Sequence, residues 1–237
     1  MLCALLALPR TCVPAPRERT SLPRQTLSDL DGLVSPRSAL ILTTGAIATG
    51  FAYAVEDPDA AEEFLSRGAL DVFSDAGNVY GSTYFLGPAS LGAWALGSAL
   101  GEPRLAGTGR DALEAIVLSH VIVAAMKVAF DRERPDGERY SFPSGHTANA
   151  VSVAPILWRS HGAGAGLVAS GLALCTALGR QEDRRHFLSD VVGGATIGFL
   201  IGDAIGRRAE AEEEGAAARA APRLEVSPRA VSLGWRW

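Results

Sequence analysis

Three short stretches of the chain contain residues that could bind a phosphate group and transfer it. They read KVAFDRERP at Lys127–Pro135, PSGH at Pro143–His146 and RQEDRRHFLSD at Arg180–Asp190. Their cations and backbone N–H groups suit phosphate oxygens, and their imidazoles could supply a nucleophile and a proton donor. They include no evident set of metal ligands. The stretches therefore predict phosphoryl transfer through a covalent histidine, with no metal and no other cofactor.

The third stretch contains the candidate nucleophile and its partner. His186 and Asp190 are four residues apart, so a helix starting near His186 would place both on one face. A carboxylate bonded to one imidazole nitrogen fixes the tautomer and leaves the other nitrogen for attack. Such a pair alone is more typical of a helix surface, and the neighbouring stretches favour the catalytic interpretation. Arg180, six residues before His186, offers a guanidinium fork to phosphate oxygens.

The PSGH stretch has the composition of an anion-binding turn. Ser144 offers a hydroxyl, and Gly145 lets the backbone approach a ligand closely. If a helix begins directly afterwards, its first N–H groups point at the anion. His146 would then lie at the edge of the phosphate site, where it could protonate a leaving alkoxide. Four residues are a weak signal by themselves, so this interpretation depends on the other two stretches.

The first stretch adds two cations. Lys127 is the only lysine of the chain and lies in an apolar segment. An unpaired buried ammonium is costly, so Lys127 either reaches the membrane interface or binds an anion. Pro135 disfavours continuation of the helix, which places Arg134 in the following loop. Lys127 and Arg134 could therefore bind the same phosphate.

Six apolar segments must position these residues. Most are shorter than, or near the lower end of, the roughly 17–25 residues of a membrane-spanning helix, so hydropathy alone does not exclude a soluble bundle. Glycines recur every fourth residue from Gly194 to Gly206, which predicts a smooth helix face for close packing, as is common between membrane helices. We predict an all-α, six-helix transmembrane bundle, with segments near 38–55, 84–100, 111–130, 146–158, 164–179 and 190–206.

Around this bundle we predict two poorly ordered tails. The chain divides into a flexible segment 1–37, the bundle 38–206 and a polar tail 207–237. The terminal RAVSLGWRW alternates like a β-strand, but one strand cannot close a barrel, and the sequence offers no role for it. The first residues include a short apolar run without the basic residues of a signal peptide, although a mis-assigned start would remove a signal, so secretion stays open.

Charge distribution predicts the topology. In a six-span arrangement, arginines are more numerous on the side of the two termini, which places both termini in the cytoplasm. The three stretches then share the extracytoplasmic face of a bacterial-type inner membrane. The net charge of −4 gives no general attraction to nucleic acid, which we do not expect as a partner. The sequence does not determine the oligomeric state.

In their order and spacing, the three stretches resemble the type 2 phosphatidic acid phosphatase superfamily, which includes bacterial class A acid phosphatases and vanadium haloperoxidases. The family pattern K-x6-RP matches Lys127, Arg134 and Pro135, and PSGH matches in full. The pattern S-R-x5-H-x3-D matches except at its first position, where this chain has Gly179. That serine is the least chemically committed position, so the departure puts little in doubt.

The resemblance implies an all-α bundle and a phosphohydrolase that needs no metal. By this similarity His186 is the nucleophile, Asp190 orients it, and His146 protonates the leaving group and later activates water. The residues implied to hold the phosphoryl oxygens are Lys127, Arg134, Ser144, Gly145 and Arg180.

Four functions are compatible with these residues. The leading hypothesis is an integral membrane phosphatase that acts on lipid phosphates or diphosphates. The second is a soluble periplasmic acid phosphatase of the same superfamily. A vanadium-dependent haloperoxidase is the third, because vanadate mimics the phosphoryl transition state and would occupy the same site. A non-enzymatic membrane scaffold is the fourth, although no motif histidine or arginine is missing.

Overall fold

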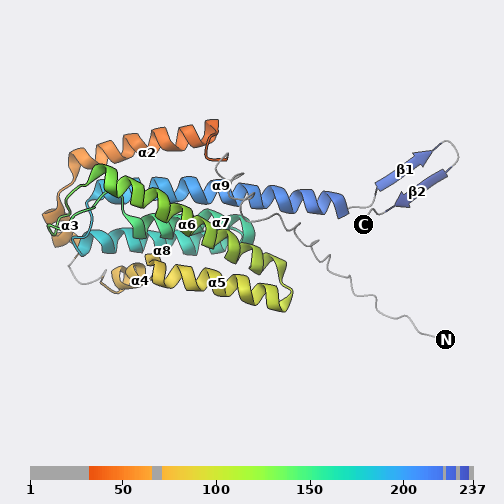
Figure 1. Cartoon of the computed structure of the whole chain (residues 1–237), viewed down its shortest axis with the longest axis horizontal. Helices are drawn as coiled ribbons and strands as arrows, with labels where there is room; N and C mark the ends of the chain where they lie inside the picture. Colours follow the sequence, from red (N-terminus) through yellow and green to blue (C-terminus); the bar gives the residue numbers. More distant parts are fainter. Residues whose placement is uncertain (1–31, 66–70, 221–222, 228–229, 235–237) are drawn as a thin grey trace. The chain divides into compact units, whose positions relative to one another are not determined.

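The structure is a computed structural model that describes residues 32–65, 71–220, 223–227 and 230–234. Residues 20–210 belong to one compact unit, and residues 211–237 belong to a second. The helices are α2 (Pro36–Val55), α3 (Pro58–Leu65), α4 (Asp71–Gly81), α5 (Thr83–Leu100), α6 (Pro103–Phe130), α7 (Gly145–His161), α8 (Ala163–Glu182) and α9 (Leu188–Ala220), drawn in Figure 1. Strands β1 (Arg223–Ser227) and β2 (Ala230–Gly234) follow.

The six predicted apolar segments lie in α2, α5, α6, α7, α8 and α9. A count of exactly six helices is not confirmed, because the acidic segment between α2 and α5 contains α3 and α4. The start of α3 has a local cause: Asp57 Oδ1 accepts the N–H groups of Asp59 and Ala60 at 3.1 and 3.0 Å, directly before Pro58. An aspartate cap followed by proline is a common helix start, and our prediction did not use this signal.

The ends of the chain differ from simple tails where the structure describes them. α9 continues through 207–220 as a regular helix. β1 and β2 pair as an antiparallel hairpin, in which Leu224 lies opposite Leu233 and Val226 opposite Val231. The alternation seen in the terminal sequence corresponds to β2. We predicted that segment 1–37 is flexible, but only residues 32–37 of it lie within the described ranges. The division of the chain into three parts stays a prediction.

Among the residues that the structure describes, four helices have the length and apolar composition of membrane spans. They are Pro36–Val55, Pro103–Phe130, Ala163–Glu182 and Leu188–Ala217. Large apolar side chains on several of these helices face outward, which a soluble surface rarely shows in such density; they include Leu40, Ile47, Phe51, Val117, Val121, Leu167 and Val168. The chain is therefore an integral membrane protein.

The glycine stripe of α9 packs directly against the backbone of α7. A Cβ atom at Gly194, Gly198 or Gly202 would overlap with a main-chain oxygen of α7. The facing residues are Ser144, Ala148 and Ser152, in that order. This contact holds the first turn of α7 next to the first turn of α9, where the predicted site residues lie.

Replacement of Gly198 by alanine should destabilise the bundle by about 1–3 kcal/mol, because the added methyl must push the two backbones apart. Gly171→Ala on α8 is the matched control, since a Cβ there meets nothing within 4 Å. It should be neutral or slightly stabilising, because alanine favours a helix over glycine. Thermal unfolding of both variants in detergent compares the effects. Equal stability of the two would contradict the packing described.

Candidate active site

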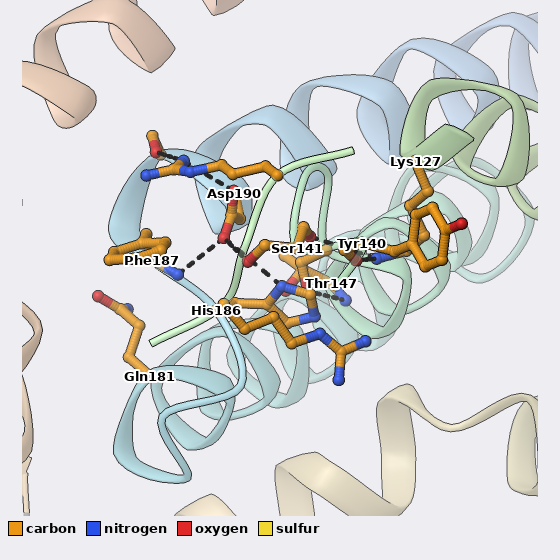
Figure 2. Close-up of polar contacts among 12 residues, drawn as sticks. Lys127, Tyr140, Ser141, Thr147, Gln181, His186, Phe187 and Asp190 are labelled. Carbon is orange, nitrogen blue, oxygen red and sulfur yellow. Dashed lines mark hydrogen bonds and ion pairs between the residues drawn. The ribbon is translucent and has the colours of Figure 1, made fainter. Parts of the chain in front are cut away.

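The predicted site residues come from helix ends and connections that lie apart in the sequence, and Figure 2 labels three of them, Lys127, His186 and Asp190. Lys127 lies in the last turn of α6, Ser144 is the N-cap of α7, and Asp190 lies in the first turn of α9. His186 precedes α9 in the short connection from α8. The Ser144 N–H donates to the Asp190 carbonyl oxygen at 2.9 Å, which connects the starts of α7 and α9 directly.

His186 and Asp190 form a buried pair. Asp190 is 0 % exposed and His186 is 5 % exposed, and Nδ1 of the imidazole lies 3.6 Å from Oδ2 of the carboxylate. This is slightly beyond a hydrogen bond, and Nδ1 has no other partner among the described residues. Because Nδ1 faces the carboxylate, Nε2 is the nitrogen left for attack on a substrate.

The carboxylate of Asp190 is fixed by three other donors. Oδ2 accepts Ser141 Oγ–H at 2.5 Å and the Phe187 N–H at 2.8 Å. Oδ1 accepts from Arg132 at 2.9 Å. Both oxygens are therefore held in place, and Figure 2 shows the His186 ring beside Ser141 and Asp190. A fixed carboxylate can hold the imidazole in one orientation.

Burial keeps His186 neutral. Desolvation lowers the pKa of His186 to about 4. Asp190 acts in the opposite direction and raises this pKa, whereas the positive charge of Lys127 lowers it further. The imidazole is protonated only below this pKa, so its nucleophilic form prevails at neutral pH. This is the protonation state that attack on phosphorus requires.

His146 is also shifted toward its neutral form. Its pKa is lowered to about 4, mainly by burial. The positive charge of Arg180 and the neighbouring His186 lower this pKa further. A general acid must carry a proton, which the site without substrate disfavours. A bound phosphate dianion would offset the nearby cations and raise the pKa of His146. The role expected for His146 therefore depends on the substrate's own charge.

Lys127 does not snorkel away from the site. Its ammonium donates to the carbonyl oxygens of Tyr140 and Ser141 at 2.5 and 3.2 Å. These bonds hold the chain segment that supplies Ser141 to Asp190. An ammonium has three N–H donors, so one remains for a ligand.

Two guanidinium groups present buried donors without an acceptor. Arg134 donates from NH1 to Glu138 at 2.7 Å, and Arg180 donates from NH1 to Asn78 at 3.1 Å and to Asp183 at 3.3 Å. Nε of each arginine is buried and has no hydrogen-bond partner among the described residues. A buried unsatisfied donor is costly, and a bound anion that accepted from these atoms would offset that cost.

Ser144 and Gly145 of the PSGH turn have different structural roles. The Ser144 hydroxyl is buried and contacts Thr147, at 3.0 Å to Oγ1 and 3.5 Å to the N–H, so it serves as the helix cap. A contact of this hydroxyl with phosphate stays a prediction. At Gly145 an added Cβ would make only an ordinary contact of 3.5 Å with Val123. The fold does not require glycine there, which is consistent with a ligand that approaches this backbone.

The structure adds residues that the sequence interpretation missed. Arg132 and Ser141 hold Asp190, Asn78 of α4 holds Arg180, and Glu56 after α2 binds Arg132. Arg132 lies within the first motif stretch, but nothing in its spacing distinguishes it from a solvent-facing loop residue. No sequence signal connects Glu56 or Asn78 to residues so far along the chain.

The region that contains the site is similar to known proteins. Residues 109–207 match the sequence model of the PAP2 superfamily. Over 86 residues the chain is 37% identical to the lipid A 1-phosphatase of Porphyromonas gingivalis, a match that covers 35% of this chain and 19% of that protein. The matched region thus spans about a fifth of the relative.

Two solved structures are also similar. The crystal structure of Aquifex aeolicus LpxE aligns with a TM-score of 0.48 and 28% identity, over 57% of this chain and 84% of that one. The first transmembrane PAP2 type phosphatidylglycerolphosphate phosphatase from Bacillus subtilis aligns with a TM-score of 0.49 and 20% identity, over 80% and 92%. The region that matches the PAP2 superfamily model, residues 109–207, includes every predicted site residue.

Proposed function

We propose that this chain hydrolyses phosphate or diphosphate monoesters of membrane lipids through a phosphohistidine on His186. The observation that carries the proposal is the buried His186–Asp190 pair in a site that also holds two arginine Nε donors without acceptors. A bound phosphoryl group would satisfy these donors. Positioned cations are also the main requirement for phosphoryl transfer, because charge is spread over the equatorial oxygens.

In the first step, Nε2 of His186 attacks phosphorus and the bond from phosphorus to the lipid oxygen breaks. The leaving oxygen takes the proton held by His146, so the lipid departs as a neutral alcohol, or as a monophosphate when the substrate is a diphosphate. The bond formed is N–P, and Asp190 stabilises the positive charge on the imidazole. Arg134, Arg180 and Lys127 are the cations near the site that would hold the three equatorial oxygens.

The second step releases phosphate. Neutral His146 accepts a proton from water, the oxygen attacks phosphorus, and the N–P bond breaks. The bonding electrons return to Nε2, which regenerates neutral His186. His146 therefore acts first as an acid and then as a base, as reversible proton transfer in a two-step displacement requires.

Two observations support a lipid as the substrate. Four helices in the described part of the chain have membrane-span length and composition. In addition, an apolar groove of about 490 Å³ between α2, α6 and α9 includes Phe130, Phe142 and Ser189, next to Asp190. A hydrocarbon chain could lie there with its phosphate at the site. The arginine excess near the termini supports an active site on the extracytoplasmic face.

The test is phosphate release from purified protein in detergent with a chelator present. Phosphatidate, an isoprenyl diphosphate and lipid A are the lipid substrates, and a soluble aryl phosphate is the comparison. We expect at least one lipid to be hydrolysed with higher kcat/KM than the aryl phosphate, with activity unaffected by the chelator. Loss of activity with chelator would contradict the mechanism, and extraction of the protein by carbonate wash would favour a soluble acid phosphatase.

A further inference from the structure

Arg132 lies outside the predicted phosphate site but makes a closed ring of polar contacts beside it. Its guanidinium donates to Ser189 Oγ at 2.6 Å and to Glu56 Oε1. Ser189 in turn donates its hydroxyl to Glu56 Oε2 at 2.5 Å. The same guanidinium nitrogen that contacts Ser189 also donates to Asp190 Oδ1 at 2.9 Å. The ring thus ends on the carboxylate that faces His186.

Glu56 connects this ring to two helices. It is the C-cap residue of α2, and its Oε2 also accepts the main-chain N–H of Ser189 at 3.1 Å. Ser189 is the second residue of α9, so the carboxylate caps the N-terminus of that helix. Side chains of Arg132 and Glu56 are only 21 % and 10 % exposed. Both charges are therefore largely removed from water, and loss of one partner would leave the other unpaired.

Two aromatic rings fix the plane of the guanidinium. Its central carbon lies 4.1 Å from the ring centre of Phe187 and 5.2 Å from that of Tyr53. Phe187 directly follows His186, and its N–H donates to Asp190. The face of the Arg132 guanidinium therefore contacts Phe187, which follows the proposed nucleophile, and its edge contacts Asp190, which orients the nucleophile.

We propose that Arg132, held by Glu56, is a positioning residue for the His186–Asp190 pair. The inference rests on the proposed function, because it assigns a role in the same reaction. Arg132 occupies Oδ1 of Asp190, so that Oδ2 is the oxygen turned toward Nδ1. Without Arg132 only the donors to Oδ2, from Ser141 and Phe187, would hold the carboxylate, so its plane could turn about that oxygen and the imidazole would lose its fixed tautomer. Neither residue is among those predicted to hold the phosphoryl oxygens, but Arg132 lines the apolar groove proposed for the lipid chain. Affinity is therefore compared with the aryl phosphate, which has no lipid chain to enter the groove, and its KM should not depend on either residue.

The test compares Arg132→Gln, Arg132→Lys and Glu56→Gln with a matched control. The control is Arg139→Gln, which removes an arginine of the same loop. Arg139 pairs with Asp131, and its guanidinium carbon lies 5.1 Å from the ring centre of Tyr140. Its side chain is 65 % exposed and contacts no site residue that the proposal uses. We expect Arg132→Gln to lower kcat by about 10–100-fold, since small misplacement of reacting groups has effects of this size. KM should change less than about twofold, because uniform substrate binding is retained.

The other variants define the contacts. Arg132→Lys keeps the charge but loses the fork and the stacking, so it should recover only part of the activity lost in Arg132→Gln. Glu56 accepts hydrogen bonds at both oxygens, whereas glutamine accepts at only one, so Glu56→Gln should also lower kcat. The double variant should lose less than the product of the single effects, because both act through one network. Arg139→Gln should retain wild-type kcat.

A readout independent of activity is the tautomer of His186. The chain has four histidines, so ¹⁵N-histidine spectra can be assigned with single replacements. In the wild type we expect one His186 tautomer with the proton on Nδ1, facing Asp190, and in Arg132→Gln a mixture of both. Wild-type kcat together with an unchanged tautomer in folded Arg132→Gln would overturn the positioning role, as would an equal loss in Arg139→Gln.

The two proposals fail in distinguishable ways. If the wild type releases phosphate from no substrate, or if a variant without His186 stays active, the proposed function fails and the tautomer measurement still decides the role of Arg132. The other case is an active wild type and an inactive His186 variant, with Arg132→Gln equal to the wild type in kcat and in the His186 tautomer. In that case only the positioning inference fails. Unfolding temperatures in detergent exclude general destabilisation as the cause of lost activity.

Discussion

Replacement of His186 by glutamine is expected to lower turnover by about 10⁴-fold or more, because the proposed covalent intermediate forms on the imidazole that this change removes. The measurement is transfer of labelled phosphate from a lipid or aryl substrate to the protein. Wild-type protein quenched during turnover should carry label that is stable in base and labile in acid, as an N–P bond is. The His186→Gln protein should carry none.

His146→Gln is the informative comparison for this experiment. An aryl phosphate has a good leaving group and needs little proton donation, so the first step should survive in this variant. The second step should be slow, because the base that activates water is missing. Label should therefore accumulate on His146→Gln above the wild-type level. Label that persists on His186→Gln would assign the nucleophile to another residue and refute the mechanism.

Arg180→Lys is expected to lower kcat/KM by about 10²–10³-fold, the usual effect of removing one preorganised donor to a transition-state oxygen. The guanidinium is held by Asn78 and Asp183 with its Nε directed to no acceptor, and an ammonium cannot reproduce this geometry. Inhibition by vanadate, which mimics the transferring phosphoryl group, should weaken by a similar factor.

Arg184→Lys is the matched control for Arg180→Lys. Arg184 lies in the same connection between α8 and α9, but its guanidinium pairs with the exposed Asp59 at 2.8 Å. This substitution keeps a cation at a position near solvent and should leave kcat/KM within about twofold, since exposed ion pairs contribute little. Wild-type kcat/KM in Arg180→Lys would show that general charge, rather than a directed donor, holds the substrate, and equal losses in the two variants would show that the effect is not specific to Arg180.

The choice of residue types for this chemistry could be predicted from the sequence, because the informative relations are local. A helix returns to the same face after four residues, so the stripe of Gly194, Gly198 and Gly202 follows from spacing. His186 also lies beside Asp190, as predicted, but it does so from the connection before α9 rather than from the face of that helix. The six apolar segments follow in the same way from runs of apolar residues. The family match over 109–207 confirms the resemblance that the three stretches indicated.

The sequence did not predict which distant residues meet. Glu56 pairs with Arg132, Asn78 with Arg180, and the Ser144 N–H with the Asp190 carbonyl, each across a large separation along the chain. The Ser144 hydroxyl contacts Thr147 and caps α7, which the sequence interpretation did not predict, and its contact with phosphate stays a prediction. These contacts depend on the direction in which each helix packs, and α7 and α9 approach closely enough only because glycines remove the intervening side chains. Local spacing therefore determined the chemical groups, whereas helix packing decided which groups hold the nucleophile and the phosphate position.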